Sequence, residues 1–114
     1  TAKVYFAPVA SFTLSANVIL SGEKVTFTNH STGGGTLVYA WDFGDGSPIS
    51  YEANPVHTFP RQTCSKSYNQ DCSKSYEVTL TVTNEFGVDD VTSEVIVDPF
   101  KRFLPFVLMA AGGE

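Results

Sequence analysis

Residues 39–46 read Tyr39-Ala40-Trp41-Asp42-Phe43-Gly44-Asp45-Gly46. Large aromatic side chains alternate here with smaller or polar ones, which is the period-two pattern of a β-strand with one buried face. Gly44 and Gly46 tolerate the positive φ of a tight turn, and Asp45 can bond the backbone of that turn. We therefore expect a central strand that buries Trp41 between two sheets and reverses directly after it.

The same alternation recurs on both sides of this segment, at short intervals separated by glycine-containing turns. Such spacing is typical of a β-sandwich or barrel, and no stretch of ten residues carries a helical apolar stripe. A last strand is expected over residues 88–97. The positions expected to point inward are Ala10, Phe12, Leu14, Val25, Phe27, Leu37, Tyr39, Trp41, Phe43, Tyr76, Val78, Leu80 and Val82. The centre of the core is expected at Tyr39, Trp41, Phe43, Val78, Leu80 and Val82.

Composition indicates one folded domain and excludes two classes of function. The chain has 114 residues, of which 42% are hydrophobic and 17% are charged, unlike a disordered segment. Its net charge of −5 comes without the basic stripe that a phosphate backbone requires, so we expect no nucleic-acid partner. The longest apolar run covers residues 103–111. A membrane-spanning helix needs about 20 residues, so we expect no membrane span.

Four further motifs flank the Trp41 segment in a fixed order. Pro8-Val9-Ala10-Ser11-Phe12 and Val25-Thr26-Phe27-Thr28-Asn29 precede it. Asn54-Pro55-Val56-His57-Thr58-Phe59 and Tyr76-Glu77-Val78-Thr79-Leu80-Thr81-Val82-Thr83-Asn84 follow it. Together with residues 39–46, these motifs resemble the PKD (polycystic kidney disease) domain family over about residues 8–97.

The resemblance implies an all-β, seven-stranded, immunoglobulin-like sandwich of two antiparallel sheets. It also implies a location outside the cell or at its surface, in a module that is not an enzyme. Residues 8–98 would form this domain, between an extended segment at residues 1–7 and an apolar extension at residues 99–114. His57 stands where the family has a strand residue, so we expect it to pack rather than to catalyse.

The chain departs from the family pattern at residues 60–75, where a short glycine-containing turn is expected. Instead, Cys64-Ser65-Lys66-Ser67-Tyr68 is repeated as Cys72-Ser73-Lys74-Ser75-Tyr76 in an inserted loop. Without metal-ligand spacing, Cys64 and Cys72 predict a local disulfide, which fits an oxidising compartment. The sequon Asn29-His30-Ser31 makes Asn29 a glycosylation candidate in the same compartment.

Both ends of the chain are apolar and contain proline, so we expect their side chains to be buried against other residues. The residues concerned are Val4, Tyr5, Phe6, Phe103, Leu104, Phe106, Val107 and Leu108. Leaving the five C-terminal ones in water would forfeit about 10 kcal/mol of burial. They can fold back on the domain or form linkers, or they can add to the sheet edge of another copy and build chains. We therefore expect a homo-oligomer or adjoining extracellular domains as partners.

Two kinds of binding site can be named from the residues. Asp42, Asp45, Asp89 and Asp90 are oxygen ligands in or near turns and are candidates for calcium, the one cofactor considered; solvated turn carboxylates are the alternative. Tyr51, Tyr68 and Phe86 lie in expected loops and are candidates for a sugar-stacking platform, with scattered exposed aromatics as the alternative. Serine in a nucleophile-elbow context is absent, which argues against a hydrolase.

These observations lead to two functional hypotheses. The first is a non-catalytic extracellular structural or adhesive module, a subunit of a surface filament or array that uses its apolar ends for contacts. The alternative is an accessory or spacer module of a secreted hydrolase that binds a polysaccharide or protein substrate.

Overall fold

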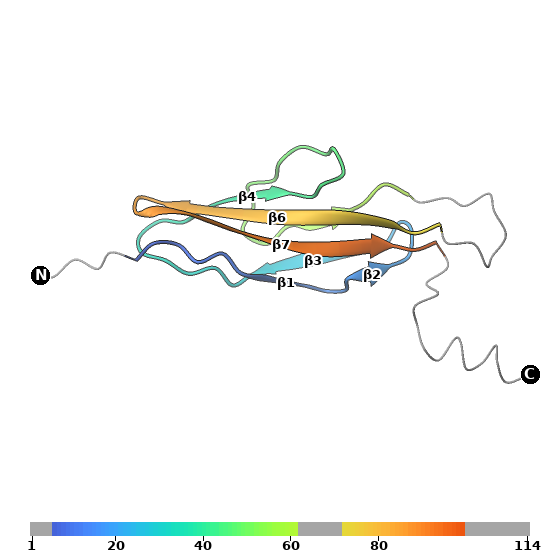
Figure 1. The fold of residues 1–114 in the computed structure, drawn as a ribbon, viewed down its shortest axis with the longest axis horizontal. Coiled ribbons are helices and arrows are strands. Elements are labelled where there is room, and N and C mark those ends of the chain that lie inside the picture. Colours follow the sequence, from blue (N-terminus) through green and yellow to red (C-terminus); the bar gives the residue numbers. More distant parts are fainter. Residues whose placement is uncertain (1–5, 62–71, 100–114) are drawn as a thin grey trace, which may run out of the picture.

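A computed structural model describes residues 6–61 and 72–99, and these residues form a two-layer β-sandwich (Figure 1). One sheet has three strands in the order β1-β3-β5, and the other has four in the order β2-β7-β6-β4. No helix in the described part of the chain is long and apolar enough to cross a membrane. The strands are β1 (Phe12–Leu14), β2 (Val18–Ile19), β3 (Lys24–Asn29), β4 (Val38–Asp42), β5 (Val56–Thr58), β6 (Lys74–Asn84) and β7 (Gly87–Val97).

Period-two alternation along the strands produces the core, as the sequence predicted. Buried and exposed residues alternate most clearly along β3 and β6, because each of these strands has one face on the core and the other in water. Tyr39 is partly buried and packs against this core. The buried hydrophobic residues are Ala10, Ile19, Val25, Phe27, Trp41, Phe43, Phe59, Tyr76, Val78, Leu80, Val82, Val95 and Val97.

The arrangement of strands differs from the expectation in two respects. Strand β4 lies at the edge of its sheet, with β6 as its neighbour among the seven strands, although its Trp41 is fully buried. Strand β2 pairs with β7 in parallel, with Val18 opposite Ile96, whereas every other strand pair is antiparallel. Two residues are too few for a period to be visible, and so alternation could not reveal β2.

Between the sheets lies a continuous group of aromatic rings. The Trp41 ring packs edge-to-face on Phe12, with centroids 5.0 Å apart, and is tilted against Phe27 at 5.4 Å. His57 stacks on Phe43 with a centroid distance of 3.9 Å and an angle of 5° between the planes. Since aromatic pairs contribute about 0.5–1.5 kcal/mol beyond their buried area, this group holds the two sheets together. The expected packing role of His57 is what the structure shows.

The turn after β4 lies directly against the backbone of β6. Gly44 has a φ of +74°, and a Cβ atom placed there would collide with the carbonyl group of Glu77. The Oδ1 atom of Asp42 accepts a hydrogen bond of 2.9 Å from the Gly44 N–H. Gly46 has a φ of +83°, but nothing lies within 4 Å of the space its Cβ would fill. The two glycines therefore share a positive φ, but only at Gly44 would a side chain collide with a neighbouring strand.

Asp45 points from this turn towards β5 and binds His57. Its Oδ2 atom lies 2.7 Å from His57 Nε2, and its Oδ1 atom accepts hydrogen bonds from the backbone N–H and the hydroxyl of Ser47. The Asp45 side chain is 3% exposed and that of His57 is 15% exposed. Burial opposes ionisation, but the hydrogen bonds from Ser47 and His57 outweigh it, so the pKa of Asp45 lies below its ordinary value.

Beside the β6–β7 turn, hydrogen bonds hold the segment by which the chain enters the domain. Asn84 Nδ2 donates to the carbonyl groups of Phe6 and Gly34, at 2.8 and 2.9 Å. The Gly34 N–H also donates to Phe6 O at 3.0 Å, and Ala10 N–H donates to Asp89 Oδ2 at 2.8 Å. The N-terminal segment is thus tied to the β6–β7 turn and to the glycine-rich loop before β4.

Several predicted segments fall wholly or partly outside the described residues. Cys64 lies among the residues that are not described, so its disulfide with Cys72 stays a prediction. Strand β6 begins at Lys74, inside the inserted loop predicted for residues 60–75. Of the extensions, only residues 6, 7 and 99 are described.

Replacing Gly44 and Gly46 separately by alanine tests the contact with β6. Positive φ alone costs a non-glycine residue roughly 1–2 kcal/mol, so Gly46→Ala should lower the free energy of unfolding by about 1 kcal/mol. Gly44→Ala adds the collision with Glu77 and should lower it by about 3 kcal/mol or more. Urea denaturation measures both values, and equal losses would mean that Gly44 does not touch β6 as described.

The Asp45→Asn variant tests the bond to His57. At about pH 7 the variant should be less stable by about 1–3 kcal/mol, because a buried hydrogen-bonded carboxylate is lost. The folded-state pKa of Asp45 is depressed, so its contribution is present above the unfolded-state pKa, near 3.8, and disappears as pH falls through the folded value. Denaturation between about pH 7 and about pH 2 should show the gap between wild type and variant closing on the acid side. A gap that does not change with pH would refute the role of the Asp45 charge.

Candidate functional site

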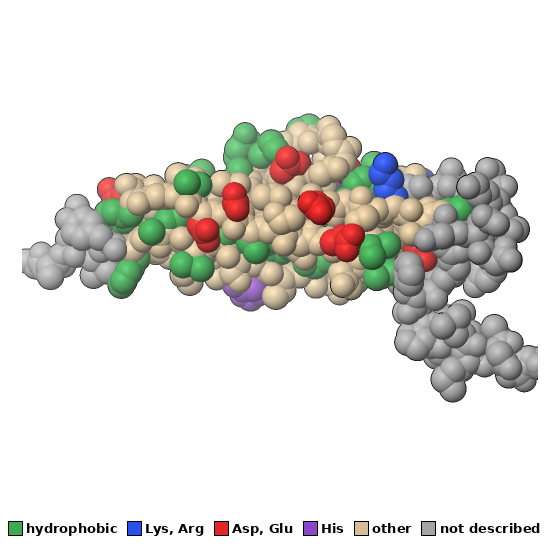
Figure 2. All heavy atoms as spheres, in the orientation of Figure 1, with side chains coloured by type: hydrophobic (Ala, Val, Ile, Leu, Met, Phe, Trp, Pro, Cys, Tyr) green, Lys and Arg blue, Asp and Glu red, His purple; other side chains and the backbone are tan. Residues whose placement is uncertain are grey.

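One face of the four-stranded sheet points away from the core, and we call it the outer sheet face. The register places its residues in rows across β4, β6 and β7. The first row is Val38, Thr83 and Val88; the second is Ala40, Thr81 and Asp90; the third is Asp42, Thr79 and Thr92; the fourth is Glu77 and Glu94. Figure 2 shows acidic side chains spread over β6 and β7 on this face.

Hydroxyl groups occupy the middle of the outer sheet face. Thr79 and Thr92 face each other across β6 and β7, and their Oγ1 atoms are hydrogen-bonded at 2.9 Å. Thr81 and Thr83 continue the same line along β6. Each hydroxyl can donate one hydrogen bond and accept others, so the line offers polar partners to a hydroxyl-bearing ligand.

Carboxylates surround these hydroxyls. Asp42, Glu77, Asp90 and Glu94 are all exposed, and none forms an ion pair with a described lysine or arginine. Glu77 and Glu94 stand directly opposite each other in the ladder, where like charges repel. The Ser75 hydroxyl donates to Glu94, which leaves the negative charge in place. The outer sheet face is therefore strongly anionic.

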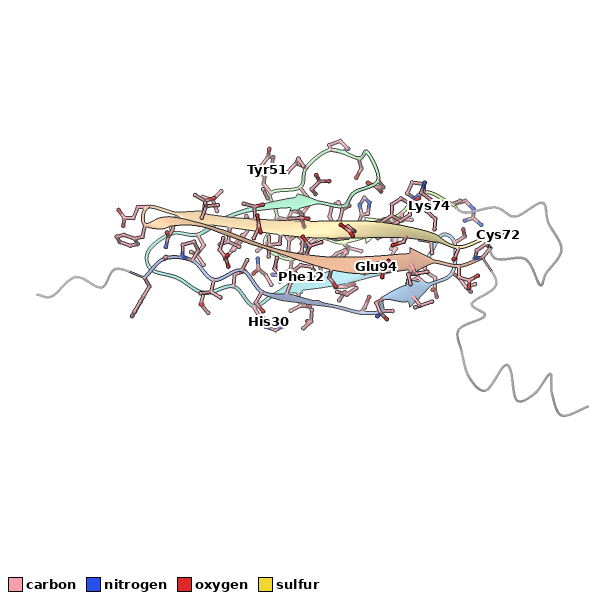
Figure 3. All side chains as sticks on the ribbon, viewed as in Figure 1. Phe12, His30, Tyr51, Cys72, Lys74 and Glu94 are labelled. Carbon is pink, nitrogen blue, oxygen red and sulfur yellow. The ribbon has the colours of Figure 1, made fainter. Side chains whose placement is uncertain are left out.

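The loop between β4 and β5 extends this face past the sheet edge. Ser50 and Trp41 exchange two backbone hydrogen bonds, of 2.8 and 3.1 Å, and the Trp41 indole N–H donates to Glu52 O at 2.8 Å. Side chains alternate on either side of such a bridge, which puts Ile49 and Tyr51 on the outward side beside Asp42 and Ala40. Tyr51 projects from the loop in Figure 3, and hydrophobic side chains gather over this loop in Figure 2.

The loop side chains and Val38 form an apolar strip along the edge of the outer sheet face. Tyr51 is 71% exposed, Val38 58% and Ile49 40%. Large apolar side chains this open to water, in neighbouring positions, mark a candidate contact surface. We call Val38, Ile49 and Tyr51 the edge strip.

The predicted sugar-stacking residues do not form a single platform. Tyr51 belongs to the edge strip, whereas the partly buried Phe86 ring packs against Gly34 at the end where the chain enters. Tyr68 lies outside the described residues. Sequence reasoning identified Tyr51 but missed its neighbours Val38 and Ile49, because their proximity depends on the Trp41–Ser50 bridge rather than on any local pattern.

The four calcium candidates are not brought together either. Asp42 caps the turn at Gly44, and Asp45 binds Ser47 and His57. Asp89 accepts from Ala10 on the inward side of β7, while its neighbour Asp90 faces out. In residues 6–61 and 72–99, no three His, Cys, Asp or Glu side chains are grouped as metal ligands.

Asn29, the glycosylation candidate, is half-buried and already bonded. Its Nδ2 atom donates to Ala53 O at 3.1 Å, and its Oδ1 atom accepts from the Ser31 N–H at 2.9 Å. The backbone N–H of Asn29 donates to Asn54 Oδ1 at 2.9 Å. In the structure, Asn29 therefore ties the end of β3 to the loop before β5, and its glycosylation stays a prediction.

The two histidines lie in different surroundings and each has a partner among the described side chains. His57 lies in the aromatic core on Asp45. His30 is exposed at the end of β3 and shares a hydrogen bond of 3.1 Å with Thr13 on the neighbouring strand.

Known proteins resemble this chain in sequence over most of the sandwich. The PKD domain family matches residues 5–98. Pre-pro-metalloprotease PrtV of Vibrio cholerae serotype O1 is 34% identical over 101 residues, which cover 87% of this chain and 9% of PrtV. Human polycystin-1 is 40% identical over 57 residues, which cover 46% of this chain and 1% of polycystin-1. The chain thus spans less than a tenth of these curated relatives.

Solved structures share the sandwich. A chain from work on the promiscuous specificity of carbohydrate-binding modules of the β-sandwich superfamily matches with a TM-score of 0.63 and 28% identity, covering 80% of this chain and 34% of that one. A chimeric titin Z1Z2 chain with an exogenous decorin peptide matches with a TM-score of 0.54 and 26% identity, covering 83% and 97%. The seven-stranded immunoglobulin-like sandwich predicted from the sequence is confirmed, and the chain belongs to the PKD domain family.

Proposed function

We propose that this chain is a non-catalytic accessory module of a secreted hydrolase, where it binds the polymeric substrate, polysaccharide or protein. Its task is to hold the enzyme on that polymer while a separate domain performs the hydrolysis. A rigid sandwich suits this task because binding residues can lie on its surface without disturbing its core.

The similarity to PrtV carries the proposal. The matching region is most of this chain but only 9% of a metalloprotease precursor, so most of that protein lies outside the similarity. In a protein of that length, a separate domain outside the matching region can perform the catalysis. The 28% identity to a chain from work on carbohydrate-binding modules supports the same interpretation, since that work concerns β-sandwiches that bind carbohydrate.

The one described pair of an aspartate and a histidine is used for structure, which supports a binding role. Asp45 and His57 are held between the turn after β4 and the aromatic core, with 3% and 15% of their side chains exposed. A general acid or base must reach its substrate, and this pair faces the core instead. A location outside the cell agrees with PrtV and polycystin-1 as relatives.

Assembly into a filament, the first hypothesis from the sequence, is the second candidate. One observation favours it: Phe6, Val9 and Val88 are 62%, 56% and 65% exposed near the end where the chain enters. Of the residues proposed for assembly, Phe6 is described, while Val4, Tyr5 and the five C-terminal ones lie outside the described residues. An apolar tail from another copy would bury these three side chains.

Binding to insoluble polymers tests the accessory role. The 114-residue chain should sediment with at least one of chitin, cellulose, chitosan or collagen and should release no soluble fragments from any of them. Protein left in the supernatant is measured by absorbance, with an unrelated β-sandwich of similar size as the control. A chain that stays in solution with all four polymers would contradict the proposal.

Particle mass tests the assembly candidate independently. Light scattering of the intact chain, beside a version that ends at Pro99, should show monomers for both if the accessory role is correct. A large species that becomes a monomer on truncation would establish residues 100–114 as an assembly segment.

A further inference from the structure

We propose that the outer sheet face, together with the edge strip, binds a polysaccharide whose sugars carry free amino groups. This inference rests on the proposed accessory function and specifies the class of ligand and the surface that takes it. Three properties of the surface carry it: an aromatic edge, a line of hydroxyls and an unpaired negative charge.

The edge strip provides the apolar contact. A sugar ring has a face of C–H groups that can lie on the ring of Tyr51, which is 71% exposed. The same ring attracts an ammonium group placed over its face, an attraction that an uncharged sugar lacks. Val38 and Ile49 lengthen the contact along β4, so that more than one sugar unit can be accommodated.

The line of hydroxyls gives the ligand polar partners on β6, the strand next to β4. Thr79, Thr81 and Thr83 project from alternate positions of β6, so neighbouring hydroxyl-bearing side chains are about 7 Å apart. Successive sugars of a polysaccharide lying along β6 could each form a hydrogen bond with a different one of these hydroxyls. Of these three hydroxyls, that of Thr79 is hydrogen-bonded to another described side chain, Thr92.

Charge selects the class of polysaccharide. Asp42, Glu77, Asp90 and Glu94 face the solvent on this surface and form no ion pair with a described lysine or arginine. The repulsion between the facing Glu77 and Glu94 carboxylates destabilises the fold, and a cation bound between them would remove this repulsion. Sulfated or carboxylated glycans are repelled by such a surface, and neutral ones gain nothing from it. Sugars with ammonium groups are attracted.

The outer face of the other sheet provides an internal contrast. Its exposed rows pair Lys24 with Thr58, Thr26 with Val56 and Thr13 with Thr28. These rows have threonines as well, but their charged member is a lysine and they contain no exposed phenylalanine, tyrosine or tryptophan. Threonine content alone therefore does not distinguish the two faces, whereas aromatic contact and negative charge do.

The experiment compares binding to cross-linked chitosan, which has free amines, with binding to chitin, in which the same amines are acetylated. At about pH 6 the chain should be retained by chitosan more strongly than by chitin or cellulose, because only chitosan offers ammonium groups to the carboxylates. Raising the salt concentration from about 0.05 to about 0.5 M should release it, because exposed charges are screened. Thermal unfolding of each variant confirms that it is folded.

Three variants locate the site. Tyr51→Ala should weaken binding to chitosan by roughly three- to tenfold, in line with the loss of a cation–π contact. The double change Glu77→Gln and Glu94→Gln should weaken it by about fivefold and should remove part of the salt dependence. Val56→Ala, an exposed apolar change on the other sheet, is the matched control and should bind as the wild type does.

The possible failures separate the two proposals. Binding to chitin, cellulose or collagen without a preference for chitosan, or binding to chitosan that Tyr51→Ala leaves unchanged, would overturn this inference and leave the accessory function standing. Retention by immobilised polylysine but not by chitosan would also overturn it, since the partner would then be a basic polypeptide. No binding to any polymer would overturn both proposals.

Discussion

Trp41 must be buried and must also find a partner for its indole N–H, and much of the molecule depends on how both needs are met. Its ring fills the space between the sheets, against Phe12 and Phe27. Its N–H reaches Glu52 O, and its backbone exchanges bonds with Ser50. The bonds that complete the core therefore also fasten the β4–β5 loop to the sheet edge. Tyr51 lies between those two anchor points, so its position on the surface follows from the packing of the interior.

Alternation in the sequence predicted the strands around Phe27, Trp41 and Leu80, because each is long enough to show one buried face. It did not predict β2, which has two residues, nor that β4 is an edge strand. Strand order depends on which distant segments of the chain pair with each other. The alternation around Trp41 would be the same in a central strand as in an edge strand that a loop covers. The burial of Val25 and Val78 could be predicted from the residues next to them in the sequence. The pairing of Val18 with Ile96 could not.

The candidate site was only partly predictable for a similar reason. Tyr51 was recognisable as an aromatic residue in a loop, and Asp42 and Asp90 as turn or surface carboxylates. The partner of Asp89 is Ala10, 79 positions away, and no spacing rule connects them. Likewise, Asn29 carries the pattern of a sequon but serves as a hydrogen-bonding link between β3 and the next loop. In each case a short motif gave the chemistry of the side chain, and the fold decided what it touches.

The parallel pairing of β2 with β7 has a mechanical consequence. Because β2 lies near the start of the domain and β7 at its end, a pull that separates the two ends drives these strands past each other along their length. The bonds from Ile96 to Asn17 and from Asp98 to Ile19, both 2.8 Å, would then be loaded in shear, sharing the force instead of opening one after another. A module pulled by its two ends would therefore bear the tension across these strands together and would not unzip one bond at a time.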